Sequence, residues 1–249
     1  AIGLLFVLSS LFYNYRLKNR ANQKLAEKNS IIEAERQRSD DLLLNILPAA
    51  VAEELKQTGK AKARHYESAT VLFTDFQAFT KIAEVLSADE LVTELDECFR
   101  AFDAITSRYG IEKIKTIGDS YMAAGGLPIP TKTSTKDTAM AAIEMAEFIC
   151  KREIKLSDDG KIPFKMRVGI HTGPVVAGIV GVKKFQYDIW GDTVNLAARM
   201  EAQSQPGKVN ISEYTYNLVR YKFDCEYRGK VQAKNKGLID MYYVKQPVG

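Results

Sequence analysis

Residues 185–201 have the sequence FQYDIWGDTVNLAARME, and this stretch governs how the rest of the chain is interpreted. A glycine ends a strand-like run, and Asp192 or Thr193 is suited to cap the helix that follows. On that helix Asn195 and Arg199 are four residues apart, so both side chains leave the same face. An amide beside a guanidinium suits a phosphate whose charge changes during a reaction. Such a pair is also common on a solvated helix face, and the rest of the chain decides between the two interpretations.

The composition bounds the possible functions. The chain has 249 residues, of which 46% are hydrophobic and 27% charged, enough for one large domain plus an appendage. Its three cysteines lie far apart with no CxxC pair, which favours a reducing compartment and argues against a disulfide framework or a zinc site. Residues 65–249 hold twenty-four Lys/Arg and twenty-four Asp/Glu, so there is no broad basic surface for nucleic acid.

The first residues have the pattern of a membrane segment. Residues 2–13 carry no charge, and tyrosines and then cations follow at Tyr13, Tyr15, Arg16 and Lys18. About 20 residues are needed to span a bilayer, so we expect residues 1–15 to be the C-terminal part of a transmembrane helix. A signal-peptide core and an amphipathic anchor are the alternatives. The membrane interpretation implies an inner or plasma membrane location, a catalytic domain in the cytoplasm and an upstream membrane or sensor domain.

The following segment predicts helices and a linker. Residues 16–47 are rich in helix formers, and an interrupted heptad pattern favours a signalling helix with a short coiled coil, or else an inert spacer. Residues 48–64 contain a second short helix over 50–57 and a basic linker. We therefore place the start of the catalytic domain at residue 65, with that domain covering 65–249.

Strand and helix patterns alternate through the globular part. The predicted strands cover 69–74, 112–117, 120–124, 164–171 and 174–180, the last two as a pair around a Thr-Gly-Pro turn. The predicted helices cover the stretch from Ser87 to Gly110, residues 135–154 and a segment from 192. This order, βαββαβ, indicates a ferredoxin-like α+β fold preceded by a long N-terminal helix.

Two carboxylates stand at the ends of predicted strands. Asp75 ends the first strand, and Asp119 occupies the tight turn between the second and third. Carboxylates at the ends of neighbouring strands can bridge two hard cations that also hold a phosphate chain. An aspartate in a turn is ordinarily only a turn former, which is the plainer interpretation of Asp119 alone.

Three separated motifs resemble one known family. They are FTDFQAFT at 73–80, KIKTIGDSYM at 113–122 and YDIWGDTVNLAARM at 187–200. In this order they closely resemble the class III nucleotidyl cyclase catalytic domain, and the likeness covers about residues 66–246. The segment before them resembles the signalling helix and transducer of membrane-bound members.

The resemblance implies a set of metal ligands. Asp75 and Asp119 match the two metal-binding aspartates of the family. The backbone of Phe76 and Gln77 matches the segment that holds metal and phosphate, and Phe76 is included among the metal ligands. The implied cofactors are two divalent cations, Mg²⁺ or Mn²⁺.

The resemblance also implies roles for five other side chains. Lys115 and Asp188 match the pair that recognises adenine, because Asp188 can accept from its amino group. Asn195 and Arg199 match the transition-state residues, and Lys234 matches the lysine on the outer phosphates. The expected activity is therefore adenylate cyclase, which converts ATP to 3′,5′-cyclic AMP and pyrophosphate. A guanylate cyclase and a non-catalytic nucleotide-binding dimerisation module are the alternatives.

Two further expectations follow from the resemblance. The family has its site at a dimer interface, so we expect a homodimer with shared sites. Ala78 stands where the family usually has Gly, which predicts strain if that residue needs a positive φ. Asn235 replaces another usual Gly, a milder change because Asn tolerates left-handed backbone.

Overall fold

The structure is a computed structural model that describes residues 2–181, 185–233 and 237–248. Its internal contacts divide the chain into two units, Ala1–Ala52 and Glu53–Gly249, and each is described by itself. The division falls twelve residues before the predicted start of the catalytic domain at 65. The larger unit therefore takes in part of the predicted transducer segment.

The smaller unit is dominated by a single helix. Helix α1 (Ile2–Leu44) runs without a break across residue 15, where the sequence predicted the junction between a membrane segment and a signalling helix. Helix α2 (Ala49–Thr58) begins directly after Pro48, which is suited to a helix start, and ends before Gly59. No helix in the described part of the chain has a stretch long and apolar enough to cross a membrane. The membrane segment therefore stays a prediction.

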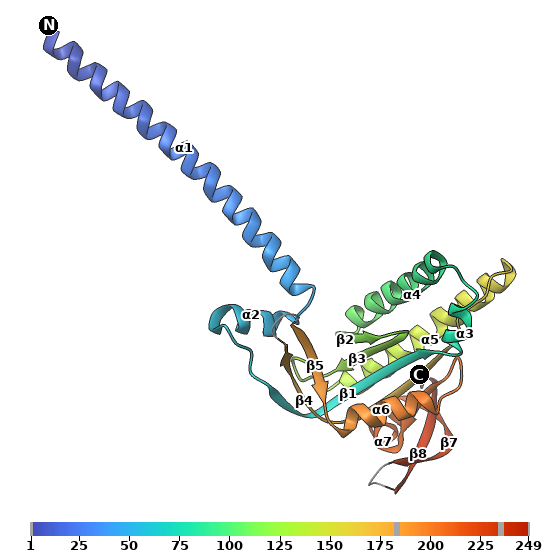
Figure 1. The fold of residues 1–249 in the computed structure, drawn as a ribbon. Helices are drawn as coiled ribbons and strands as arrows, with labels where there is room; N and C mark the ends of the chain where they lie inside the picture. The colour runs from blue at the N-terminus through green and yellow to red at the C-terminus, as the bar shows by residue number, and fades with distance from the viewer. Residues whose placement is uncertain (1, 182–184, 234–236, 249) are drawn as a thin grey trace. The chain divides into compact units, whose positions relative to one another are not determined.

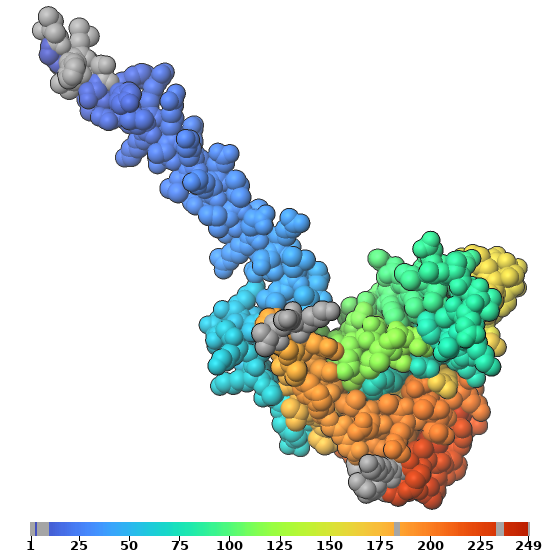
Figure 2. Space-filling view, in the orientation of Figure 1, coloured from blue at the N-terminus to red at the C-terminus, as the bar shows by residue number. Residues whose placement is uncertain are grey.

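One mixed sheet forms the centre of the larger unit (Figure 1). Its first four strands are β1 (Arg64–Phe76), β2 (Glu112–Ile117), β3 (Ser120–Gly125) and β4 (Met166–Val180). The others are β5 (Gln186–Trp190), β6 (Val209–Ser212), β7 (Phe223–Ala233) and β8 (Gly237–Pro247). The spatial order is β2-β3-β1-β4-β6-β8-β7, and β5 pairs with β4. In the space-filling view, the orange and red segments that follow β4 form one continuous surface (Figure 2).

Two long helices cover one face of this sheet. They are α4 (Ala88–Arg108) and α5 (Ser134–Asp158). The predicted cap of α4 is confirmed, because Ser87 and Glu90 form a reciprocal capping box. The buried face of β1 presents Leu72 and Phe76 to the same core as Phe102 of α4. With β1 to β4, these helices give the predicted ferredoxin-like βαββαβ core.

Three shorter helices complete the fold: α3 (Phe79–Ala83), α6 (Asp192–Ala202) and α7 (Glu213–Val219). Helix α6 packs closely against β4. A Cβ at Gly169 would lie 1.8 Å from the backbone nitrogen of Glu201, and one at Gly173 would lie 2.6 Å from Oγ1 of Thr193. The two glycines are four residues apart on one strand, so they share a face and together make room for the helix.

Two local predictions were wrong. Residues 164–171 and 174–180 are not a hairpin, because β4 continues through Gly173 and pairs with β1 on both sides of it. Pro174 has no N–H to donate, and it lies where the register with β1 shifts between Tyr66 and Ala69. The bulge in β1 thus lets the proline remain inside a strand.

The predicted side-chain cap of α6 is also absent. Gly191 is the N-cap residue, with φ 140°, and no side chain caps the helix. The hydroxyl of Thr193 donates to the carbonyl of Pro174 at 2.7 Å instead, so it ties α6 to β4.

Candidate active site

The two predicted metal-binding carboxylates lie together. Asp75 is near the end of β1, and Asp119 is in the turn between β2 and β3. The backbone N–H of Phe76 donates to Oδ2 of Asp119 at 3.2 Å, which fixes the turn against the end of β1. Burial and the negative charge of Asp75 raise the pKa of Asp119 above its usual value.

Three further residues, which the sequence analysis did not identify, surround these carboxylates. Nη2 of Arg167 lies 2.8 Å from Oδ1 of Asp75, and the hydroxyl of Ser120 donates to its Oδ2 at 2.7 Å. Arg167 also pairs with Glu201 of α6, with Nε 2.9 Å from Oε1. Burial raises the pKa of Glu201 to about 7, and the nearby guanidinium opposes that shift. An arginine within an otherwise apolar strand pattern was the signal that could have identified Arg167.

These donors fit divalent cations. The described residues contain no group of three or more His, Cys, Asp or Glu that could hold a metal by itself. Mg²⁺ is commonly held by only one or two carboxylates together with substrate phosphates, and Asp75 and Asp119 supply that set. Burial and, after it, the charge of Asp75 raise the pKa of Asp119, and a cation between the two carboxylates would stabilise their charged forms.

The two residues predicted to recognise the base also lie together. Nζ of Lys115 is 2.6 Å from Oδ2 of Asp188, and both side chains are partly buried. Lys115 lies on β2 and Asp188 on β5, far apart in the chain. The carboxylate also accepts the backbone N–H of Ile189 at 2.9 Å, through Oδ1. Both oxygens of Asp188 therefore have partners that fix its orientation.

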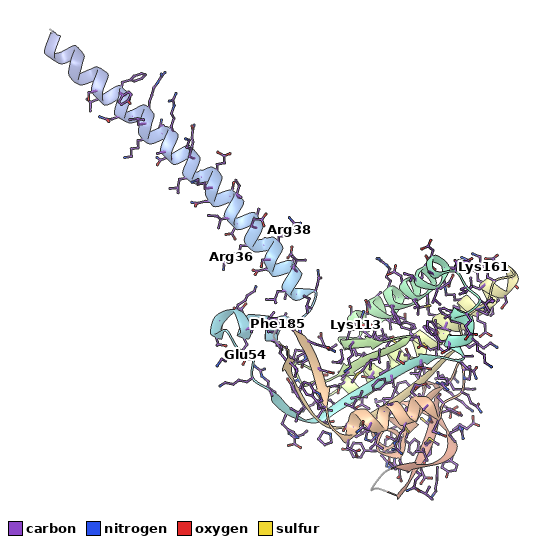
Figure 3. The ribbon with its side chains drawn as sticks, in the orientation of Figure 1. Arg36, Arg38, Glu54, Lys113, Lys161 and Phe185 are labelled. Carbon is purple, nitrogen blue, oxygen red and sulfur yellow. The ribbon has the colours of Figure 1, made fainter. Side chains whose placement is uncertain are left out.

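A bulge in β2 directs Lys115 to this position. The pairing with β3 shifts register between Lys113 and Lys115, so the two lysines lie on opposite faces although they are two residues apart. Lys113, labelled in Figure 3, pairs with Asp103 of α4 at 2.8 Å. Without the bulge, Lys115 would point to the same helix-covered face and could not reach Asp188.

The predicted transition-state residues lie on α6. Asn195 is exposed, and Arg199 follows it by one turn on the same helix. Nη1 of Arg199 donates to the backbone carbonyl of Gln232 at 2.5 Å, near the end of β7. Lys234, the predicted phosphate-binding lysine, lies outside the described residues.

The backbone predicted to hold metal and phosphate makes bonds within the chain. The N–H of Phe76 donates to Asp119, and the N–H of Gln77 donates to the carbonyl of Lys165 at 2.7 Å. A phosphate approaching these two donors would have to compete with those bonds. Their carbonyl oxygens can serve the metal-binding part of the predicted role, whereas the phosphate-binding part would need N–H groups that already donate within the chain.

The described site residues thus form separate groups. One holds Asp75, Asp119 and Arg167, a second holds Lys115 and Asp188, and the third is on α6. Within the described ranges, no hydrogen bond or ion pair joins the first group to the second.

Comparison with known proteins shows the family of this chain. Residues 61–246 match the family model described as the adenylate and guanylate cyclase catalytic domain. An adenylate cyclase of Mycobacterium tuberculosis is 39% identical over 220 residues, which cover 88% of this chain and 49% of that protein. The soluble guanylate cyclase subunit beta-2 of Rattus norvegicus is 36% identical over 228 residues, covering 91% of this chain and 33% of that protein. The chain spans half or less of the length of these relatives.

The chain is also similar to solved structures of cyclase domains. The catalytic core of a rhodopsin-guanylyl cyclase with converted specificity, in complex with ATPαS, aligns with a TM-score of 0.68 and 32% identity. The alignment covers 74% of this chain and 98% of that core.

Proposed function

This chain belongs to the adenylate and guanylate cyclase catalytic domain family, and we propose that it is an adenylate cyclase, which converts ATP to 3′,5′-cyclic AMP and pyrophosphate. The observation that carries the choice of ATP is the ion pair of Lys115 and Asp188 at 2.6 Å. Adenine presents an amino donor and a ring acceptor on the edge that such a pair can contact. A fixed carboxylate accepts from the amino group, and the ammonium of Lys115 donates to the ring nitrogen.

Guanine fits the same pair less well. Its edge presents a carbonyl acceptor and an amide donor where adenine has a donor and an acceptor. A carboxylate at position 188 would then face the carbonyl oxygen, which is a repulsive contact. Guanylate cyclase remains the second candidate, because a soluble guanylate cyclase subunit is also 36% identical to this chain.

The reaction needs positioning and charge stabilisation more than covalent chemistry. The ribose 3′-oxygen attacks the α-phosphorus within one molecule, and the bond to the pyrophosphate oxygen breaks. The divalent cations, when bound, lower the pKa of the 3′-hydroxyl and neutralise the leaving phosphates. Asp75 and Asp119 would hold those cations, with the backbone of Phe76.

The cationic side chains act on the phosphates. Arg199 would donate to the α-phosphate as negative charge builds there, and Asn195 would orient the ribose. Lys234 would bind the outer phosphates. Arg167, which pairs with Asp75 at 2.8 Å in the structure, supplies a further guanidinium next to the metal-binding carboxylates.

The separation of the site groups supports a homodimer with shared sites. In a two-fold dimer, each surface faces the equivalent surface of a second copy. Asp75 and Asp119 of one protomer would then act with Lys115, Asp188, Asn195, Arg199 and Lys234 of its partner. Attachment to an inner or plasma membrane through residues 1–15, a cytoplasmic location and an upstream sensor domain belong to the same proposal.

The test is direct identification of the product. The purified chain is incubated with Mg²⁺ or Mn²⁺ and with ATP and GTP, separately and in equal mixture, and the nucleotides are identified by mass spectrometry. We expect cyclic AMP and pyrophosphate in equal amounts, and we expect ATP to dominate in the mixture. Asp75→Asn keeps the shape of the side chain but loses a charge, so it should be folded and inactive.

The alternatives give different products. Cyclic GMP as the main product would replace the proposal with a guanylate cyclase. Binding of nucleotide with no cyclic product would support the non-catalytic module. Activity that persists in Asp75→Asn would contradict the proposed metal site.

A further inference from the structure

One cavity lies apart from the described residues assigned to catalysis. It has a volume of about 640 Å³ and lies between β4, β8 and the first residues of α6 and α7. This volume is within the range of small-molecule sites, roughly 300–1,000 Å³. None of the described site residues proposed above lines it.

The floor of the cavity is polar and held in place by hydrogen bonds. His171 is 8% exposed, and its Nδ1 lies 2.6 Å from the hydroxyl oxygen of Ser212. That hydroxyl lies 3.2 Å from Oγ1 of Thr215, which accepts the backbone N–H of Thr172 at 2.9 Å. The imidazole is therefore fixed by a buried network, so the floor is formed before any ligand arrives.

The walls are mainly apolar, and the rim carries negative charge. Pro174, Leu196 and Ile239 supply apolar surface, and Tyr214 supplies an exposed aromatic ring on α7. The ring of Tyr214 lies 6.4 Å from that of His171, measured between centroids. The carboxylate of Glu213, which is exposed, also lines the cavity beside Tyr214, and no lysine or arginine is among the described residues that line it.

Apolar walls, an exposed aromatic ring and a carboxylate together favour one class of ligand. We propose that the cavity binds a small organic cation with a flat apolar body, and that its occupation regulates turnover. The apolar walls fit the body of such a molecule, while Glu213 and the face of Tyr214 attract its positive charge. The exposed carboxylate of Glu213 disfavours anions, so the nucleotide and pyrophosphate suit this cavity less well than a cation does.

The cavity is lined by two elements that also carry proposed active-site residues, so a bound ligand can affect turnover. Leu196 of its wall is adjacent to Asn195 on α6, and Arg199 follows by one turn. Leu238 and Ile239 lie at the start of β8, shortly after Lys234 in the chain. A ligand that contacts both elements changes the energy of any state in which they move, and so changes turnover. The proposed effect on turnover rests on the proposed cyclase activity, whereas the proposed binding of a cation to the cavity does not.

Three related probes test the charge preference. Tryptamine is a cation, tryptophol is neutral and indole-3-acetate is an anion, and all three carry the same indole body. Binding to the full chain is measured by titration calorimetry. We expect tryptamine to bind saturably, tryptophol to bind more weakly and indole-3-acetate not to bind.

Exposed variants locate the binding site without disturbing the core. Glu213→Gln and Tyr214→Ala should each weaken tryptamine binding about two- to five-fold, which corresponds to one exposed charge contact or cation–π contact. Glu147→Gln, an exposed glutamate on α5 away from the cavity, should leave the affinity unchanged. Thermal unfolding confirms that each variant is folded.

Activity is measured separately from binding. Tryptamine should change kcat for the preferred nucleotide in the parent chain and in Glu147→Gln, and should have a weaker effect at the same concentration in Glu213→Gln. Equal binding of the three probes, or unchanged affinity in both cavity variants, would overturn the site. Binding with no change in kcat would overturn the regulatory role. A chain that binds tryptamine but makes no cyclic nucleotide would contradict the proposed function and leave the binding site standing.

Discussion

At the scale of single residues, substrate choice should depend on Lys115 and Asp188. The change Lys115→Glu with Asp188→Cys inverts the pattern of donors and acceptors that faces the base. We expect the double variant to shift its kcat/KM preference toward GTP by roughly ten- to a hundred-fold, since one bidentate base contact discriminates by about 1–3 kcal/mol. Competition between ATP and GTP measures the shift. Full retention of the ATP preference would show that another pair recognises the base.

Ala78 is a second residue whose effect can be measured. It has φ 56° and ψ 28°, in the left-handed region that disfavours a Cβ. We expect Ala78→Gly to stabilise the protein by about 0.5–1 kcal/mol, because the relieved strain exceeds the added freedom of the unfolded chain. Urea unfolding measures the difference. Ala101→Gly, in the middle of α4, is the matched control and should destabilise by about 1 kcal/mol.

Glu112 should make stability depend on pH. Burial raises its pKa from an ordinary value of 4.5 to about 7. Between these two values the unfolded chain releases the proton and the folded chain keeps it, so the folded state loses stability as pH rises from 4.5 to 7. The loss is up to about 3 kcal/mol, at about 1.4 kcal/mol for each pKa unit.

The variant Glu112→Gln cannot ionise at this position and should lack that loss. Urea unfolding at pH 5 and pH 8 gives the change in the free energy of unfolding for each protein. The parent chain should lose more stability between the two pH values than the variant does. Parallel curves would mean that the carboxyl of Glu112 is better hydrated than its burial indicates.

Much of the site could be predicted at this scale because the functional residues lie within the sequence motifs themselves. Asp75 and Asp119 come together as expected, and so do Lys115 and Asp188. Strain at Ala78 was expected if that residue needed a positive φ, and its φ is positive. Arg167, Ser120 and Glu201 were missed, because strand pairing brings the first two to Asp75 and helix packing brings Glu201 to Arg167. Contacts of that kind join residues far apart in the chain, so the local sequence marks Arg167 only as a charge in an apolar strand and does not indicate its partners.

At the scale of elements, the packing of α6 on β4 should be sensitive to one methyl group. In Gly169→Ala the new Cβ would meet the backbone nitrogen of Glu201, which cannot rotate away. We expect a loss of about 3 kcal/mol in the free energy of unfolding and a fall in kcat, because α6 carries Asn195 and Arg199. Gly173→Ala meets only the side chain of Thr193, so its effect should be smaller. Equal stability of the two variants would contradict this account.

Most helices and strands could be predicted from the sequence, but the bulge in β2 and the continuous course of β4 could not. The capped start of α4 and the hairpin at Gly118 follow from local residue preferences. The bulge in β2 does not, because nothing in the residues around Ile114 distinguishes a bulged strand from a regular one. The Thr-Gly-Pro segment of β4 has the local composition of a turn. Pairing with the irregular part of β1 overrides that preference. This pairing exists only in the folded sheet, so the local sequence does not predict it.

At the scale of the whole molecule, the shared site predicts complementation between inactive chains. Asp75→Ala and Arg199→Ala damage different halves of the site. In a mixed dimer, one site has both lesions and the other has neither. Random pairing makes about half of the dimers mixed, each with one intact site of two, so roughly a quarter of the parent activity should return.

The control for this experiment shows that subunits exchange between the two dimers. Two differently tagged proteins are mixed and co-purified, and activity is measured on the same sample. Each variant alone should stay inactive. Zero activity in a sample that contains mixed dimers would show that each site is built within one chain.

Strand β4 gives the molecule a constraint on chain length. It pairs with Asp75 near one end, through Arg167, and with Asp188 near the other, through Gly178. Adding or removing a single residue between these points would turn every later side chain to the opposite face of the sheet. The separation of eleven positions from Arg167 to Gly178 is therefore as much a part of the active site as any side chain. A substitution in this strand leaves that spacing unchanged, whereas an insertion or deletion between the two points alters it.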